Sequence, residues 1–168
     1  RFGTIQDGVS TFFGLDKANT KIQLIYGLSK NIQVGVSRES LRQTYASSIK
    51  INLKKQNNNF PLNISAYSTI NLNSELNQDI YPLMEFYDRL SYATQILLSR
   101  RVGNKLSLEL APTFVRQNLV LESLQEHNQI GLGFGGRYKL SKRNSLNADY
   151  IYNFNRHEAS VYVNPLTI

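Results

Sequence analysis

Apolar and polar residues alternate along two segments, 129–140 and 145–155, which flank the polar stretch Ser-Lys-Arg-Asn. In the first segment, one parity is apolar: Ile130, Leu132, Phe134, Tyr138 and Leu140. The other parity holds glycines and cations: Gly131, Gly133, Gly135, Arg137 and Lys139. The second segment sets Leu146, Ala148, Tyr150, Tyr152 and Phe154 against polar neighbours. A period of two on both sides of a tight turn predicts a β-hairpin, and strands of about ten residues with one apolar face can cross a bilayer at a tilt.

The same alternation recurs earlier in the chain and predicts six further strands, at 20–28, 31–38, 45–54, 62–72, 88–101 and 105–116. Tyr67 interrupts the pattern of the fourth strand, and Pro112 removes one backbone donor from the sixth. The predicted fold is therefore all-β, an antiparallel up-and-down sheet of about eight strands. Each strand is expected to have one apolar and one polar face.

The predicted connections alternate between short and long. The segments 29–30, 102–104 and 141–144 are short, 39–44 and 55–61 have six and about seven residues, and 73–87 and 117–128 are long. Outer-membrane barrels have this rhythm, with short periplasmic turns and longer outer loops. The predicted strands also exceed the usual five or six residues of globular sheets. Both features favour a transmembrane β-barrel over a soluble lipocalin-like barrel, whose strands alternate as well.

The two ends of the chain, 1–19 and 156–168, both fall on the side of the long connections, and 1–19 is expected to form an ordered loop. Bacterial single-chain barrels have an even number of strands, and their termini generally lie on the short-turn side. We therefore expect residues 1–168 to form a single β-barrel domain that is incomplete at both ends, within a protein of ten or more strands.

Composition and charge argue against a helical membrane protein and a nucleic-acid-binding protein, but they do not indicate a particular activity. The 168 residues include no Cys and no Trp, and ten Tyr outnumber eight Phe. Mean hydropathy is negative, and no apolar run approaches the roughly 18 residues that a membrane helix needs. The net charge of +7 is dispersed over strand faces and turns rather than gathered into a basic stretch. Nucleic-acid binding is therefore not expected, because it requires a clustered basic surface.

The polar parity of the predicted strands carries a basic bias. If the apolar parity meets lipid, the following charged side chains face the lumen: Lys21, Lys50, Lys54, Arg89, Arg101, Lys105, Glu109, Arg137, Lys139 and Asp149. In a hydrated lumen this bias would favour anions, since rings of Lys and Arg select them. The alternative is that these side chains interlock with Asn, Gln and backbone groups and plug a small barrel. Conductance in planar bilayers distinguishes the two.

No residue pattern indicates catalysis. His127 and His157 lie in or beside predicted loops, and neither has the convergent ligands that a metal site requires. Ser160 and Asn155 are near His157 only in sequence, which does not define a catalytic triad. The GLGFGG stretch lies inside a predicted strand rather than in a phosphate-binding loop. We therefore expect no enzyme activity, no cofactor and no bound metal.

Several short elements stand out along the chain: RFG (1–3), FFGLDKAN (12–19), YGLSKNIQVGV (26–36), the strand start at Tyr45, and NPL (164–166). Together they resemble an uncharacterised outer-membrane β-barrel family of Bacteroidota, defined as a domain of unknown function. The resemblance covers most of the chain and is most specific in its first fifty residues. It implies an outer-membrane location, with a strand before the RFG-like element and more strands after the NPL-like one. The chain departs from the family pattern in lacking a terminal aromatic-ended strand.

Three roles are consistent with these features. The first is an integral outer-membrane barrel, not an enzyme, that acts as a narrow pore or a structural barrel in contact with outer-membrane lipid. The second is a barrel subunit of an envelope assembly, which docks to other envelope proteins through aromatic residues in loops: Phe12, Phe13, Tyr81, Phe86 and Tyr87. The third is a soluble periplasmic barrel that carries a small apolar ligand.

Overall fold

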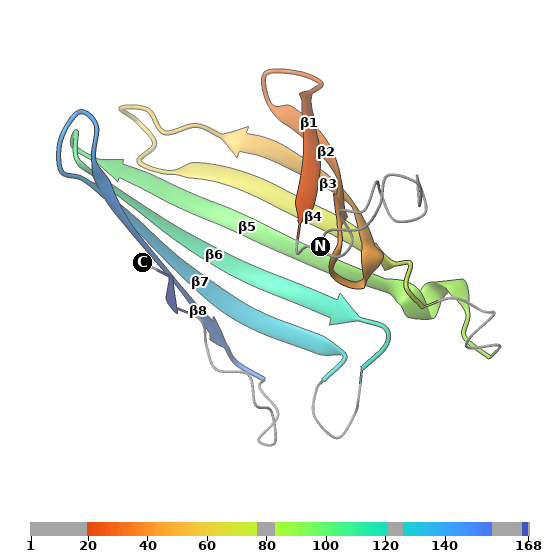
Figure 1. Ribbon diagram of the computed structural model, residues 1–168. Helices are drawn as coiled ribbons and strands as arrows, with labels where there is room; N and C mark the ends of the chain where they lie inside the picture. Colours follow the sequence, from red (N-terminus) through yellow and green to blue (C-terminus); the bar gives the residue numbers. More distant parts are fainter. Residues whose placement is uncertain (1–19, 77–82, 121–125, 156–165, 168) are drawn as a thin grey trace.

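The computed structural model describes residues 20–76, 83–120, 126–155 and 166–167. Within them, nine strands form one sheet in which every strand pairs antiparallel with the next one along the chain (Figure 1). The strands are β1 (Lys21–Gly27), β2 (Ile32–Glu39), β3 (Thr44–Lys54), β4 (Asn63–Asn73), β5 (Leu90–Val102), β6 (Leu106–Gln117), β7 (Asn128–Lys139), β8 (Ser145–Asn153) and β9 (Leu166–Thr167). The predicted all-β, up-and-down arrangement of eight long strands is confirmed.

The strand boundaries lie within two residues of the predicted ones, with the largest differences at the start of β5 and the end of β8. A 3-10 turn, η4 (Phe86–Arg89), occupies the positions at which the sequence predicts the first residues of β5. The backbone N–H of Glu85 donates to Oδ2 of Asp88 over 2.9 Å, and the N–H of Asp88 donates to the Glu85 carbonyl over 3.2 Å. These hydrogen bonds close the turn, so that extended structure begins only at Leu90.

The short strand β9 lies in a segment for which the sequence predicts irregular structure. Its backbone pairs with β8 opposite Asp149 and Tyr150. Two residues are too few to produce a recognisable alternation, because the pattern needs at least four to eight positions. This strand therefore could not be found from periodicity.

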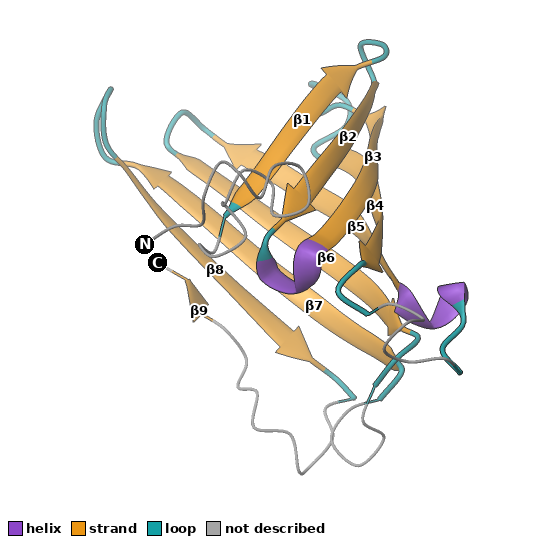
Figure 2. Cartoon of the chain, turned by 45° about the vertical axis from the view of Figure 1, so that its right-hand side comes forward, coloured by secondary structure: helices purple, strands orange, loops and turns teal. Residues whose placement is uncertain are grey.

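The sheet is strongly curved, so that β1 and β2 stand at a steep angle to β6–β8 (Figures 1 and 2). In the part of the chain that the structure describes, β1 and β9 are the two edges of the sheet and do not pair with each other. The described strands thus form a curved barrel wall that is not closed.

Strand register places the apolar side chains on one face and the polar side chains on the other. One row of paired residues is apolar except for a serine: Leu24, Val36, Ser47, Ile70 and Tyr92. The next row belongs to the opposite face: Gln23, Ser37, Ala46, Asn71 and Ser91. The apolar face is open, with Leu24 70% exposed and Ile70 49% exposed. A sheet of a soluble protein shows the reverse, with its apolar face packed on a core.

The most buried residues lie on the polar face. Gly35, Ala111 and Gly133 are buried there, whereas the apolar face of the same strands is largely exposed. A Cβ atom at Gly133 would lie 3.2 Å from the Cβ of Ala111 and 3.4 Å from its carbonyl oxygen. A side chain at this position would require β6 to give way by a few tenths of an ångström, so glycine here allows β6 and β7 to pack closely.

The connections lie alternately at the two ends of the sheet. One end, here the short-turn end, has 28–31, 55–62, 103–105 and 140–144, and the long-loop end has 40–43, 74–89 and 118–127. The predicted alternation of lengths fails at 40–43, which is shorter than 55–62. Arg42 and Gln43 have φ of 54° and 43°, in the left-handed region, and the Gln43 N–H donates to the Ser40 carbonyl over 3.2 Å. This tight turn joins β2 directly to β3.

Candidate functional site

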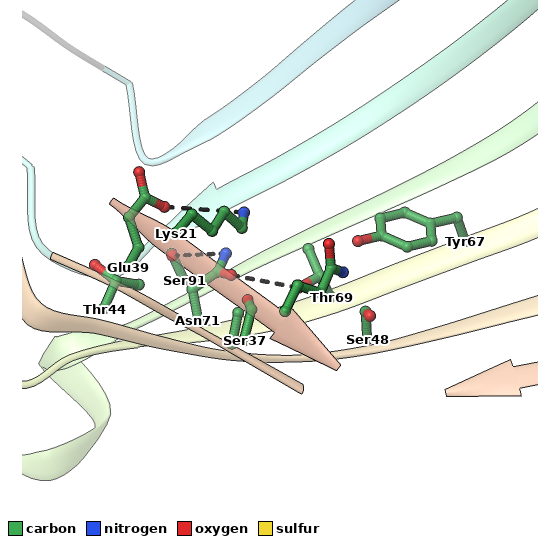
Figure 3. A pocket seen from close by; sticks show the side chains of 11 residues that line it. Lys21, Ser37, Glu39, Thr44, Ser48, Tyr67, Thr69, Asn71 and Ser91 are labelled. Atoms are coloured by element: carbon green, nitrogen blue, oxygen red, sulfur yellow. Dashed lines mark hydrogen bonds and ion pairs between the residues drawn. The ribbon is translucent and has the colours of Figure 1, made fainter. Parts of the chain in front are cut away.

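A pocket of about 380 Å³ opens on the polar face near the long-loop end (Figure 3). Side chains from five consecutive strands, β1 to β5, line it, which shows that the polar face is the concave one. The lining is almost entirely polar: Lys21, Gln23, Ser37, Glu39, Thr44, Ala46, Ser48, Tyr67, Thr69, Asn71 and Ser91. Tyr67, which interrupts the alternation in the sequence, points into this pocket with its hydroxyl group (Figure 3).

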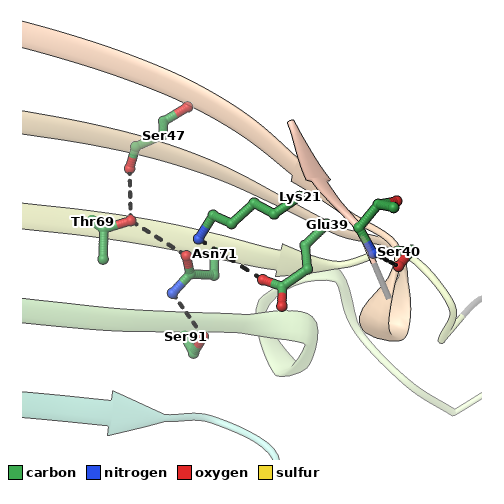
Figure 4. A network of polar contacts seen from close by, with 8 residues as sticks. Lys21, Glu39, Ser40, Ser47, Thr69, Asn71 and Ser91 are labelled. Atoms are coloured by element: carbon green, nitrogen blue, oxygen red, sulfur yellow. Dashed lines mark hydrogen bonds and ion pairs between the residues drawn. The ribbon is translucent and has the colours of Figure 1, made fainter. Parts of the chain in front are cut away.

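Polar contacts hold the wall of the pocket together (Figure 4). The Thr69 hydroxyl donates to the Ser47 carbonyl over 3.1 Å, and the Asn71 amide donates to the Ser91 hydroxyl over 3.4 Å. Nζ of Lys21 lies 3.9 Å from Oε2 of Glu39 across the β1–β2 pair. The charges of this pair compensate each other, so the long-loop end of the polar face is close to neutral.

Seven of the ten charged residues predicted to face the lumen belong to the polar face by strand register: Lys21, Lys50, Arg101, Glu109, Arg137, Lys139 and Asp149. Lys105 lies in the adjoining turn, where its carbonyl accepts the N–H of Lys139 over 2.8 Å. Glu39 also belongs to this face but is missing from the predicted set. The sequence offers a signal for it, because it continues the polar parity one residue beyond the predicted end of the second strand.

Two residues of the predicted set are placed differently. The register of β3 against β4 shifts between Asn52 and Lys54, so that Lys54 pairs with Ile64 of the apolar face. Its Nζ lies 4.1 Å from the centroid of the Phe60 ring, a cation–π contact. Arg89 lies in η4 rather than in a strand, and its Nε donates to the Asn73 carbonyl over 3.1 Å. Neither Lys54 nor Arg89 therefore belongs to a row of paired strand residues on the polar face.

Four of the remaining basic side chains gather at the short-turn end of the polar face, whereas Lys50 stands on β3 between Gln33 and Tyr67. Arg101, Ser107, Arg137 and Asn147 form one row across β5–β8, and Lys139 follows on β7. We call Arg101, Lys105, Arg137 and Lys139 the basic mouth. All four are exposed, and no carboxylate of the described residues lies within ion-pair distance of them. None of the four therefore has an ion-pair partner among the described residues.

Two carboxylates stand in the row next to the basic mouth. Glu109 and Asp149 flank Gly135 in the register of β6, β7 and β8. A Cβ at Gly135 would lie 2.9 Å from Oδ1 of Asp149 and 3.5 Å from the Cβ of Glu109. The missing side chain thus leaves room for both acids on one face.

Among the described residues, the structure brings no catalytic groups together. Nδ1 of His127 lies 2.9 Å from the Gln117 carbonyl oxygen, and His157 and Ser160 lie outside the described residues. No group of three or more metal-ligating side chains occurs in the described part of the chain. Nor does any helix in that part have the length and apolar character needed to cross a membrane.

The predicted partner-contact residues are only partly described. Phe86 and Tyr87 lie in η4 and are 53% and 67% exposed, and their rings meet edge to face at 6.0 Å. Phe12, Phe13 and Tyr81 lie outside the described residues.

An antiparallel sheet with an exposed apolar face and a polar, hollowed face defines a membrane-bound β-barrel domain. The family model described as "Membrane bound beta barrel domain (DUF5777)" matches residues 1–168, and the chain belongs to this family. No curated protein and no solved structure matches the chain. The family argues against the soluble periplasmic alternative, as does the pocket, whose polar lining does not suit an apolar ligand.

Proposed function

We propose that the protein is an integral β-barrel of a bacterial outer membrane. Its resemblance to a β-barrel family of Bacteroidota supports an origin in these bacteria. In this proposal the protein acts without catalysis, as a narrow pore or a structural barrel. The inversion of the two faces carries the proposal: aliphatic and aromatic side chains are exposed, while polar side chains line the hollow. Exposing such an apolar face to water would be costly, whereas the hydrocarbon of a bilayer solvates it.

Contacts between neighbouring strands on the polar face support a structural barrel with interlocked side chains. Nε2 of Gln95 donates to the Thr113 hydroxyl over 3.0 Å, and the Ser65 hydroxyl donates to Oδ1 of Asn52 over 2.9 Å. These side chains hold each other against the wall between the pocket and the basic mouth. Small barrels are commonly filled by interlocked side chains of this kind.

The basic mouth supports a preference for anions in any passage that conducts. Its four cations have no carboxylate of the described residues within ion-pair distance, whereas Lys21 at the other end is paired with Glu39. An anion entering from the short-turn end would meet uncompensated positive charge first, and rings of Lys and Arg favour anions.

Planar bilayers with a salt gradient test this proposal. A pore is expected to give small single-channel currents and a reversal potential shifted towards the anion equilibrium potential. Absence of current from correctly folded protein would assign the barrel a structural role. A cation preference would contradict the role of the basic mouth. Loss of the protein from the outer-membrane fraction of cells would contradict the location.

A second role, as a subunit of an envelope assembly, is favoured by the exposure of Phe86 and Tyr87 in η4. Aromatic side chains are enriched at protein interfaces. If this role holds, other envelope proteins should co-purify after extraction in mild detergent, and replacement of both rings by alanine should release them.

A further inference from the structure

The outward, apolar face carries charge only at its ends. In the described strands its charged residues are all basic: Arg38, Lys54, Arg100 and Arg116. From Leu108, which pairs with Arg100, to Arg116, β6 extends about 26 Å at about 3.3 Å per residue. At a tilt of about 40° this corresponds to about 20 Å of membrane thickness, close to the apolar band of known barrels. The two basic ends therefore lie at the depth of lipid headgroups.

Arg116 has the geometry of a headgroup ligand at the long-loop end. It is exposed and stands between Tyr92 of β5 and Asn128 of β7. Its Nε donates to Oδ1 of Asn118 over 3.2 Å and its Nη1 donates to Oδ1 of Asn128 over 3.3 Å. Both acceptors are neutral amides, and no carboxylate of the described residues lies within ion-pair distance. The guanidinium is thus oriented while its charge remains uncompensated.

The neighbouring connection carries exposed apolar side chains and is linked to Arg116 through Asn118. Nδ2 of Asn118 donates to the Tyr87 carbonyl over 2.6 Å, which ties the end of β6 to η4. In this connection Leu83 is 98% exposed, and Phe86 and Tyr87 are more than half exposed. Aromatic side chains flank the apolar band of membrane barrels at the headgroup level, so this group of residues matches an interface between hydrocarbon and headgroups.

The carboxylates of the same connection that belong to the described residues are Glu75, Glu85 and Asp88. Oδ2 of Asp88 accepts the Glu85 N–H and caps η4, and none of the three acids is within ion-pair distance of Arg116. On the strand pair β2–β3, Arg38 repeats the combination of guanidinium and aromatic ring. Its Nε donates to the Tyr45 hydroxyl over 3.0 Å.

We propose that Arg116, together with Phe86 and Tyr87, binds the phosphate group of a membrane lipid at the long-loop end. The guanidinium supplies paired N–H donors that match phosphate oxygens, and the rings contact the acyl chains and the glycerol or sugar region beneath the phosphate. Charge complementarity selects this occupant, since the outward face has basic residues and no acidic ones in the described strands. The inference rests on the proposed membrane location and is independent of any conductance.

The test uses the purified protein in a neutral detergent with lipid A carrying two phosphates as the probe. Monophosphoryl lipid A and inorganic phosphate serve as comparisons, and native mass spectrometry measures the bound fraction. The wild type is expected to bind the doubly phosphorylated lipid several-fold more tightly than the singly phosphorylated one. Arg116→Gln should weaken binding about tenfold, because charge-assisted bidentate hydrogen bonds are lost, and Arg116→Lys should weaken it less.

Arg143→Gln, in the exposed turn 140–144 at the opposite end, is the matched control and should leave binding unchanged. Circular dichroism and heat-dependent electrophoretic mobility establish that each variant is folded. Equal binding by the wild type and Arg116→Gln would overturn the proposal. So would full competition by inorganic phosphate, or a co-purifying protein that is lost on replacement of both rings while lipid binding persists. A protein that binds the lipid but passes no current would refute only the pore.

Discussion

The two halves of the polar face differ in how tightly their side chains pack and in how their charges are paired. In β1–β5, medium-sized polar side chains leave a pocket between them, and the charges of Lys21 and Glu39 compensate each other. In β6–β8 and the turn before them, glycine and alanine allow close packing around Ala111, and three of the four cations of the basic mouth, Lys105, Arg137 and Lys139, have no ion-pair partner among the described residues. The comparison indicates that shape and charge are set separately: one half provides space, and the other carries most of the cations that have no ion-pair partner.

The largest effect is expected from filling the close-packed half. Gly133→Val would force a side chain against Ala111, whose Cβ would be 3.2 Å from the new Cβ. We expect a loss of about 2 kcal/mol in the free energy of unfolding, typical of overpacking. Urea titration of the protein in phospholipid vesicles, followed by tyrosine fluorescence, measures it. Gly27→Val is the matched control, since a Cβ at Gly27 meets nothing within 4 Å; equal losses in both variants would show that strand flexibility rather than packing matters.

The next effect concerns the charge of the basic mouth. Arg101→Glu combined with Arg137→Glu places two carboxylates in a row that now holds two guanidinium groups. We expect the reversal potential in a salt gradient to move towards the cation equilibrium potential, because a ring of acids favours cations. Replacing Lys21 by Gln, at the neutral end, should shift it much less. Equal shifts from both changes would place selectivity along the whole passage.

A smaller effect is expected where the pocket half is itself tight. A Cβ at Gly35 would lie 2.8 Å from the hydroxyl oxygen of Ser48, which is a small side chain that can rotate. Gly35→Ala should therefore cost about 1 kcal/mol of unfolding free energy. In a Ser48→Ala background the cost should fall by about half, as expected for residues in contact. A double-mutant cycle measured by urea titration checks this, and strict additivity would contradict it.

The smallest effect is expected from the Lys21–Glu39 ion pair. The two side chains are 54% and 35% exposed and 3.9 Å apart, and exposed pairs contribute about 0.2–1 kcal/mol. Lys21→Met should lower the unfolding free energy by a few tenths of a kcal/mol at low salt and by nothing measurable at about 1 M salt. A loss that persists at high salt would indicate that packing of the lysine stem is responsible.

Strand positions and faces could be predicted from the sequence because alternation is a local property of each strand. Ile130, Leu132 and Phe134 mark the outward face of β7 without reference to any neighbour. The placement of Lys54 could not be predicted, since the shift that sets it opposite Ile64 depends on pairing with β4. The same holds for the crowding at Gly133, which is determined by Ala111 on another strand.

The sequence predicts the excess of basic residues on the polar face but not where along that face they gather. The basic bias of the polar parity is visible in the sequence, whereas its division into a compensated end and an uncompensated end requires the register of eight strands. The alternation of apolar and polar residues also gives no sign of the cap formed by Asp88. Because of this cap, Arg89 lies in η4 and β5 begins only at Leu90.

Every described strand pairs with its neighbour along the chain. Such a wall can form by sequential strand pairing, since each strand pairs with the strand that directly precedes it in the chain. Low sequence separation between partners keeps the entropic barrier to forming this wall small, so barrel closure, which joins strands far apart in the chain, should be slower than the pairing of consecutive strands.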